Sequence, residues 1–502
     1  MKFAASTAVC AIALLALGGC STGIAPANKS RAVSVAAPFT QEMRVTGEGV
    51  FGGEQVSYEA ALETYDISGK EGRPGVELVS VSYVAEPKAD APPRPVLFVF
   101  NGGPISASLY LHMGAVGPKR VHVPEDLSAS VDAYTLVDNP YSPLDVADIV
   151  LFDPASTGFS RVVEGGDPEA YYSVEADAQQ FTDFVAAWLS RHNRQEAPVY
   201  ILGESYGTMR AAEAAGQFAE AEDVNAPAGV FLMGQAVNII EYAQRRQNII
   251  SYVVSLPTLV AMGVEQGKVD THGKSVEEYM AEASEFAETE YLLALFQGNR
   301  LSDDALQSVA SKLESYTGLP AEYFVEKGLK VKKDEYRLAL LADEGKVLGV
   351  ADGRYISDDA KQDASGVISY GYYNGFRQYM TETFGLDIEG TYKPSAEVAG
   401  LSAWDWGGSS PFSAYDYSVG IDKAFEANPD LRVLIGNGYH DTMTTVGAAE
   451  YLAAQANWPG SQVRLSFYPG GHMAYSLDTS AERFGQDIRD WVTGQGNWAN
   501  VE

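Results

Sequence analysis

The residue with the clearest chemical use is Ser205, in the stretch Gly203-Glu204-Ser205-Tyr206-Gly207. Glycines two residues before and two after a serine are typical of a sharp turn from a strand into a helix. The apolar run 199–202 predicts that strand, and 208–218 predicts the helix. Because glycines let the two backbones pass closely, the hydroxyl would stand exposed above the sheet. The pattern indicates a nucleophile for attack on a carbonyl carbon.

A serine becomes a strong nucleophile only when a histidine takes its proton. Three histidines follow Ser205, and a chain order of serine, acid and then histidine is typical of such sites on α/β sheets. His472 follows the predicted strand 463–468 and is the predicted base. His272 lies in a polar turn, and His440 lies where the acid is expected.

A carboxylate must also orient the histidine and stabilise its charged form. Asp441 follows the apolar run 431–435 and is the predicted acid, because the carboxyl end of a strand faces the site. Asp430, before that run, and Asp478, after His472, are the alternatives.

A second loop offers hydrogen-bond donors. Asn101-Gly102-Gly103-Pro104 directly follows the apolar run 96–100. A glycine pair there allows a backbone amide to point at the site, beside the amide of Tyr206. The two amides would stabilise an oxyanion.

The elements that position these loops predict an α/β fold. Apolar runs without alternation are typical of strands buried on both faces. These runs are 96–100, 149–152, 199–202, 229–233 and 431–435. Residues 79–83 alternate and predict a half-buried antiparallel strand, and 173–191 predicts a helix. We expect a mostly parallel sheet with helices on both faces.

The middle of the chain predicts a helical cap, with helices over 239–254, 276–296 and 303–316. We place the cap at 238–392 and the sheet domain at 41–237 and 393–502. Trp404 and Trp406, near the return to the sheet domain, are open between a cleft and a packing role.

The N-terminus predicts an export signal over 1–19. Leu17-Gly18-Gly19-Cys20 resembles the lipobox of bacterial lipoproteins, which implies lipidation of Cys20 in a bacterial cell envelope. Ser21 after the cysteine suits an outer-membrane address, and a composition rich in Ala, Ser and Pro predicts a flexible tether over 20–40. A signal cleaved without lipidation is the alternative. Since Cys10 lies within the signal, no internal disulfide is expected.

Composition excludes several partners. The net charge is −32, from 67 acidic and 35 basic residues, and no basic tract is present, so we expect no nucleic-acid partner. No H-E-x-x-H or paired-cysteine spacing occurs, so we expect no metal and no cofactor.

Taken together, the motifs resemble the serine carboxypeptidase family, peptidase S10, of the α/β-hydrolase superfamily. Asn101 to Pro104 resembles its NGGPG segment, and Gly203 to Gly207 resembles its GESYxG turn. Asp153 to Ser160 resembles a third segment, and Gly438 to Asp441 and Gly470 to His472 resemble its acid and histidine loops. The short interval between acid and histidine is closest to the bacterial branch.

The resemblance implies three groups of site residues. The catalytic triad would be Ser205, Asp441 and His472. The oxyanion hole would be Gly103 and Tyr206. The substrate's terminal carboxylate would be bound by Asn101, Gly102 and Glu204. The resemblance places peptide substrates in the cleft.

Glu204 can accept a substrate carboxylate only when it is protonated, because two nearby carboxylates cannot both stay charged. We therefore expect peptide hydrolysis to be best in acid and to fade as Glu204 ionises. Ala115 stands where eukaryotic members carry a second glutamate that hydrogen-bonds the first. This difference weakens the expected exopeptidase specificity.

The predicted function is a lipid-anchored serine carboxypeptidase that releases C-terminal residues from peptides. An esterase or acyltransferase with the same triad is the nearest alternative. A surface peptide-binding protein with an inactive triad is a third, from a different functional class.

Overall fold

The computed structural model describes residues 39, 42–70, 72–87, 91–221, 224–396, 401–408, 415–496 and 498. The predicted signal, Cys20 and the predicted tether apart from Phe39 lie outside these ranges. Phe39 stacks on Phe159 with ring centroids 4.7 Å apart. The described end of the predicted tether therefore packs on the folded domain.

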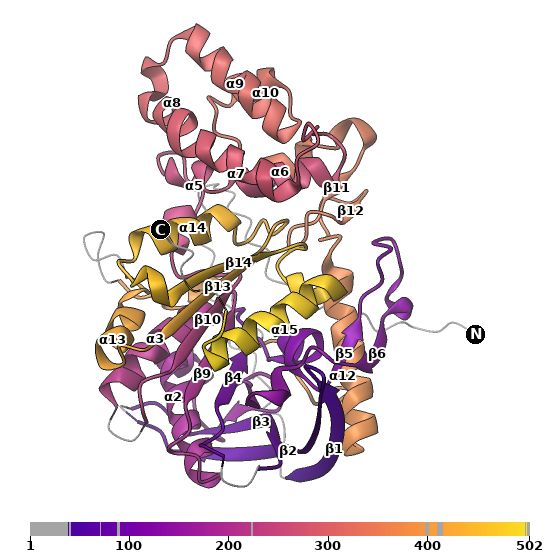
Figure 1. Ribbon diagram of the computed structural model, residues 1–502, viewed down its shortest axis with the longest axis vertical. Helices are drawn as coiled ribbons and strands as arrows, with labels where there is room; N and C mark the ends of the chain where they lie inside the picture. The colour runs from indigo at the N-terminus through magenta and orange to yellow at the C-terminus, as the bar shows by residue number, and fades with distance from the viewer. Residues whose placement is uncertain are drawn as a thin grey trace.

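A large, mostly parallel sheet forms the centre of the molecule (Figure 1). Its strand order is β1-β2-β3-β7-β4-β9-β10-β13-β14, with β8 paired to β3. Strands β7 to β14 in this order are parallel, and β1, β2 and β3 extend the sheet in antiparallel fashion. The strands are β1 Met43–Phe51, β2 Glu54–Ile67, β3 Val76–Ala85, β4 Val96–Phe100, β7 Asp148–Phe152, β8 Arg161–Val162, β9 Val199–Glu204, β10 Gly229–Met233, β13 Arg432–Gly438 and β14 Val463–Tyr468.

Two hydrophobic clusters cover the two faces of this sheet. In β4, Phe98 and Phe100 belong to one cluster, and Leu97 and Val99 belong to the other. The first cluster includes α2 Val174–Arg191, α3 Gly207–Glu220 and α13 Val419–Ala427. The second includes α12 Gly366–Phe384 and α15 Asp478–Thr493. Side chains alternate between faces in a strand, so burial on both sides explains the continuous apolar runs.

The prediction for 79–83 was correct in its antiparallel pairing and wrong in its burial. Strand β3 lies between β2 and β7 and is buried along most of its length. Leu78 packs in one cluster, whereas Val79 and Val81 pack in the other. Both faces of β3 are covered. Ser80 and Ser82 make the sequence alternate between apolar and polar residues, but these two small side chains are buried as well.

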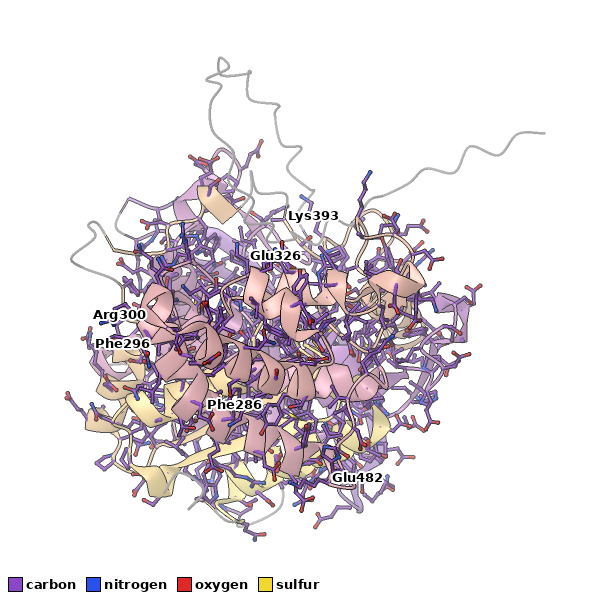
Figure 2. All side chains as sticks on the ribbon, turned by 90° about the horizontal axis from the view of Figure 1, so that it is seen from above. Phe286, Phe296, Arg300, Glu326, Lys393 and Glu482 are labelled. Atoms are coloured by element: carbon purple, nitrogen blue, oxygen red, sulfur yellow. The ribbon has the colours of Figure 1, made fainter. Side chains whose placement is uncertain are left out.

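A helical lobe lies at the top of Figure 1, above the sheet domain. Its hydrophobic core contains residues from Tyr252 to Leu348, together with Tyr439 and Val446 of the sheet domain. Its elements are α4 Ile239–Tyr242, α5 Ile250–Val253, α6 Leu256–Glu265, α7 Val276–Phe286, α8 Leu292–Gln297, α9 Asp303–Thr317, α10 Ala321–Glu326, α11 Lys333–Ala339, β11 Val347–Leu348 and β12 Ile356–Ser357. Figure 2 looks onto this lobe and shows Phe296, which is 71% exposed, at its edge.

Helix α12 falls within the range 238–392 that we assigned to the cap, but it packs elsewhere. Tyr372, Phe376 and Tyr379 belong to the cluster on the sheet, and the Phe376 ring lies 5.4 Å from that of His112. In Figure 1 this helix runs beside the sheet domain, away from α6–α10. The part of the insertion that packs in the core of the lobe therefore ends near Leu348.

The helix predicted over 239–254 is interrupted in the structure, where α4 ends at Tyr242 and α5 begins at Ile250. The Asn248 side-chain amide donates to the carbonyls of Ile240, Glu241 and Ala243 at 3.2, 2.7 and 3.0 Å. These are carbonyls that a helix end leaves without partners. Asn248 thus stabilises the break.

A buried ion pair joins the two helices below Ser205. Arg210 of α3 and Asp177 of α2 are 0% and 1% exposed, and Arg210 Nε donates to Asp177 Oδ2 at 2.8 Å. Arg210 Nη1 also donates to the carbonyl of Asn101 at 3.0 Å. The pair therefore supports the loop after β4.

We expect Asp177→Ala to lower the free energy of unfolding by about 3–5 kcal/mol, because it leaves the Arg210 charge buried without its partner. Urea unfolding followed by circular dichroism measures this loss. The control is Asp183→Ala, on the same helix, which removes a pair with the exposed Lys70 and should change stability by less than about 1 kcal/mol. Equal effects of the two changes would contradict the prediction.

Candidate active site

Ser205 lies at the turn between β9 and α3. Its φ is 60°, in the left-handed region, and it is partly exposed while its neighbours are buried. A Cβ on Gly203 would lie 2.3 Å from the carbonyl oxygen of Gly207, so the strand-to-helix crossing requires glycine. The Ser205 amide donates to the carbonyl of Met233 in β10 at 2.9 Å. The turn presents the serine at the carboxyl end of the parallel strands.

His472 and Asp441 form a close pair on neighbouring loops. His472 Nδ1 lies 2.6 Å from Asp441 Oδ2, and the two residues are 7% and 0% exposed. Their loops follow β14 and β13, which are paired in parallel, so both leave the same edge of the sheet. The amides of Met443 and Thr444 donate to Asp441 Oδ1 at 2.7 and 3.1 Å. The carboxylate is therefore held in one orientation.

Ser205 and His472 both lie beside the end of β10. The Ser205 amide bonds Met233, and a Cβ on the next residue, Gly234, would lie 3.1 Å from His472 Cε1. Burial acts to lower the pKa of His472, but the charge and hydrogen bond of Asp441 outweigh it and raise that pKa to about 9. The pair is thus arranged to stabilise an imidazolium.

The alternative histidines and acids lie elsewhere. His272 is in an exposed turn beside Asp270. His440 is buried, and its Nε2 is 3.9 Å from Glu265 of α6. Asp430 precedes β13 and is exposed, and Asp478 pairs with Arg120. Of these candidates, the structure brings only Asp441 into contact with His472.

The loop after β4 lies directly against the serine turn. A Cβ on Gly102 would lie 2.5 Å from the amide nitrogen of Tyr206, so only glycine allows this approach. Gly103 has a φ of 120°, which also favours glycine. Within the described residues, the amides of Gly103 and Tyr206 donate to no backbone carbonyl. Both are therefore available for an oxyanion.

The ring of Tyr206 is fixed by two tryptophans. It packs edge-on against Trp404 and Trp406, at 5.3 and 5.9 Å between centroids. Trp404 is buried, and the ring of Tyr172 stacks on it at 5.8 Å. The structure therefore gives the two tryptophans, which the sequence left open, a packing role beside the serine turn.

Glu204 is a buried carboxyl group next to the nucleophile. It is 3% exposed, and Asn101 Nδ2 donates to its Oε1 at 3.0 Å. The hydroxyl of Tyr475 donates to its Oε2. Burial raises the pKa of Glu204 to about 7, against the opposing effects of His472, Tyr475 and Asn101. Glu204 therefore keeps its proton to a higher pH than an exposed glutamate does.

Sequence reasoning missed Tyr475. The Ala115 side chain has no polar group that could bond Glu204. The neighbouring Gly114 lies against Tyr475, since a Cβ on Gly114 would be 2.4 Å from the Tyr475 ring. Tyr475 thus provides a hydrogen bond that Ala115 does not. Its position three residues after His472 is the one local signal that could have suggested it.

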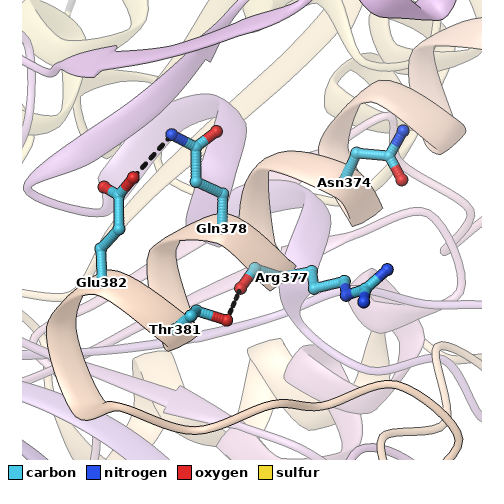
Figure 3. Close-up of a pocket in the computed structure, with 5 residues that line it drawn as sticks. All are labelled: Asn374, Arg377, Gln378, Thr381 and Glu382. Carbon is cyan, nitrogen blue, oxygen red and sulfur yellow. Dashed lines mark hydrogen bonds between the residues drawn. The ribbon is translucent and has the colours of Figure 1, made fainter.

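A surface depression lies away from these residues. It is lined by Asn374, Arg377, Gln378, Thr381 and Glu382, all on the outer side of α12 (Figure 3). Two of its polar side chains bond each other, since Gln378 donates to Glu382 at 2.8 Å. It contains none of the residues around Ser205 and is not the candidate site.

The described ranges lack two kinds of feature. In those ranges, no cluster of three or more His, Cys, Asp or Glu side chains is arranged to hold a metal ion. None of the helices in that part of the chain has the length and apolar character that a bilayer span requires.

A family model described as serine carboxypeptidase matches residues 82–289, which include the loop after β4 and the serine turn. This part of the chain is similar to the serine carboxypeptidase family. Asp441 and His472 lie beyond the matched range, so their assignment rests on the geometry above.

Two known proteins are similar to this chain, one in sequence and one in fold. Serine carboxypeptidase-like 36 of Arabidopsis thaliana is 32% identical over 114 residues, 22% of this chain and 22% of that protein. The match thus spans about a fifth of the relative's length. A crystal structure of Kex1(delta)p, a prohormone-processing carboxypeptidase from Saccharomyces cerevisiae, aligns with a TM-score of 0.53 and 14% identity, over 87% of this chain and 91% of that one. This likeness confirms the predicted α/β-hydrolase fold.

Proposed function

We propose that this protein is a serine-type carboxypeptidase that releases C-terminal residues from peptides through an acyl-enzyme on Ser205. The observation that carries the proposal is the juxtaposition of the His472–Asp441 pair and the serine turn with a buried carboxyl group, Glu204, beside the nucleophile. The first two features support acyl transfer, and the third supports recognition of a terminal carboxylate.

The reaction follows from these positions. Ser205 Oγ attacks the scissile carbonyl carbon while His472 Nε2 takes its proton, and Asp441 stabilises the resulting imidazolium. The amides of Gly103 and Tyr206 hold the oxyanion. His472 then gives the proton to the leaving amine, which departs as the C-terminal amino acid. Water attacks the acyl-enzyme by the same steps and releases the shortened peptide.

Recognition of the terminal carboxylate is assigned to Glu204, with Asn101 and Gly102 beside it. A protonated Glu204 has one O–H to donate to the substrate, whereas an ionised Glu204 repels it. The hydrogen bonds from Asn101 and Tyr475 fix the orientation of the carboxyl group. Burial, which raises the pKa, keeps the neutral form present up to about neutral pH.

A side-by-side assay of a blocked dipeptide and its C-terminal amide tests the proposal. We expect Ser205-dependent cleavage of the free acid and much slower cleavage of the amide. The absence of a second carboxyl group at Ala115 favours an esterase or acyltransferase. Such an enzyme would cleave the free acid and the amide at similar rates. A peptide-binding protein with an inactive triad would cleave neither and would not be labelled at Ser205 by a fluorophosphonate.

We predict that Glu204→Gln removes the alkaline loss of activity on free-acid peptides. In the wild type, kcat/KM should fall by about tenfold for each pH unit above the pKa of Glu204, because the ionised group repels the substrate carboxylate. Glutamine stays neutral, so the variant should show no such fall. Measurements of kcat/KM from acid to alkaline pH test this, and identical alkaline limbs would refute it.

The companion variant is Tyr475→Phe. The Tyr475 hydroxyl lowers the pKa of Glu204, so its removal should move the alkaline limb to higher pH. An ester substrate without a free carboxylate serves as the control, since its alkaline limb should not depend on Glu204.

We also propose that the protein is held in a bacterial cell envelope by lipid on Cys20, facing peptides outside the cytoplasm. The support is the lipobox-like Leu17-Gly18-Gly19-Cys20. Membrane fractionation of cells expressing wild type and Cys20→Ala tests this. Equal release of both into the soluble fraction would end the idea.

A further inference from the structure

A short segment of the insertion lies against both catalytic loops. We call residues 349–354 the strap. It connects β11 to β12 at the edge of the helical lobe, and the Gly349 amide donates to the carbonyl of Tyr355 at 2.8 Å. None of the sequence motifs included it.

The strap bonds the backbone of the histidine loop. The His472 amide donates to the Ala351 carbonyl at 2.6 Å, and the Gly471 amide donates to Asp352 Oδ2 at 3.1 Å. A Cβ on Gly471 would lie 2.3 Å from the Ala351 oxygen, so the close approach requires glycine. A loop containing two consecutive glycines is flexible by itself, and the strap supplies its hydrogen-bond partners.

The strap also bonds the acid loop. The Gly353 amide donates to the His440 carbonyl at 2.9 Å, and Thr442 Oγ1 donates to the Val350 carbonyl at 2.6 Å. His440 and Thr442 flank the catalytic acid, Asp441. One segment of six residues therefore joins the two loops whose side chains must meet.

Buried charges hold the strap itself in place. Asp352 is 2% exposed and Arg354 is 8% exposed, and Arg354 Nε lies 3.0 Å from Asp352 Oδ1. Asp363 accepts from the amides of Val350 and Ala351 at 2.8 and 3.2 Å. Gln266, the residue that follows α6, donates to the carbonyls of Gly353 and Arg354, each at 3.2 Å, which ties the strap to the helical lobe.

We propose that the strap sets the distance between His472 and Asp441, and that Asp352 is a positioning residue for the catalytic histidine. This inference rests on the proposed serine hydrolase function. The 2.6 Å contact joins side chains on two separate loops, and the strap is bonded to the backbones of both. A misplacement of about 1 Å can slow such a reaction by about a hundredfold. The helical lobe, to which the strap is bonded, is thus required for the alignment of the triad.

The test variant is Asp352→Asn. Asp352 uses both oxygens as acceptors, Oδ1 for Arg354 and Oδ2 for Gly471 and Arg354. Asparagine has nearly the same volume but only one oxygen, so one of these contacts must be lost. We expect both kcat and the rate constant for fluorophosphonate labelling of Ser205 to fall about tenfold, and we expect KM to change less than about twofold.

Two controls separate positioning from loss of fold. Glu344→Gln makes the same carboxylate-to-amide change in an ion pair of the helical lobe with Lys268, two residues that lie outside the strap, and should leave both rate constants unchanged. Asp363→Asn disturbs the strap without touching either catalytic loop and should reproduce the slower labelling. Labelling of every variant should still reach completion, because a slow but folded enzyme reacts fully.

A readout independent of activity completes the experiment. The proton between His472 Nδ1 and Asp441 should give a low-field NMR signal in the wild type, and Asp352→Asn should broaden or shift it. An unchanged signal together with wild-type labelling rates would overturn the strap proposal. Reduced final labelling at an unchanged rate would overturn it too, since that result indicates unfolding. If the wild type is not labelled at all, the proposed function fails, and the NMR comparison alone decides the role of the strap.

Discussion

Ser205→Ala should lower turnover of peptide and ester substrates by about 10⁵-fold and abolish fluorophosphonate labelling. The hydroxyl is the only group at this turn that can form the acyl-enzyme, and the adjacent amides can stabilise an oxyanion only after an attack has occurred. Residual hydrolysis would come from water bound in the same site. Burst kinetics with a chromogenic ester measure the loss, because the burst reports the acyl-enzyme directly.

The fold should survive this change. Gly203 and Gly207 shape the crossing, and the bond to Met233 uses the backbone of residue 205. Ser205→Gly is the matched control, because glycine adopts a φ of 60° without the strain that a Cβ brings. The glycine variant should be as inactive as the alanine variant and should have a higher melting temperature than the alanine variant. Retention of more than a tenth of wild-type activity by either variant would remove Ser205 from the mechanism.

Asp441→Asn should reduce kcat by about 10⁴-fold with little change in fold. Asp441 Oδ1 accepts from the amides of Met443 and Thr444, so the oxygen of asparagine will stay on that side. Its NH₂ group then faces His472 Nδ1 and forces that nitrogen to act as an acceptor. The ring proton moves to Nε2, which can no longer take a proton from Ser205.

Two measurements accompany the loss of kcat. The pKa of His472, followed by the chemical shift of its ring protons, should fall, because the charge of Asp441 is what raises it. Asp478→Asn is the matched control, since this acid is six residues from His472 but pairs with Arg120. Its kcat should stay within about twofold of the wild type. A larger loss from Asp478→Asn than from Asp441→Asn would show that the acid is assigned wrongly.

Local sequence was sufficient to predict the frame of the site. The apolar runs predicted β4 and β10 with the same bounds that the structure has, because strands buried on both faces contain few polar residues. Glycine patterns placed the turns at 101–104 and 203–207, because there a side chain would collide with backbone. Chain order then selected His472 and Asp441, which the structure brings into contact.

Other features depended on contacts between segments far apart in the chain. Tyr475 and Glu204 are separated by 271 residues, and Gly471 and Asp352 by 119. No periodicity links such pairs, so the hydrogen-bond partner of Glu204 and the strap could not be predicted. The same reason applies to α12, whose aromatic residues suit either the cap or the sheet.

The sequence by itself indicated which side chains are candidates for the chemistry and which strand ends hold them, because those requirements act within a few residues of each motif. Only the tertiary structure decided how that chemistry is tuned. It buried Glu204 between Asn101 and Tyr475, which raises its pKa, and laid the strap across the loops of His472 and Asp441. Burial and alignment are properties of the packed chain, since each arises from groups that meet only after folding.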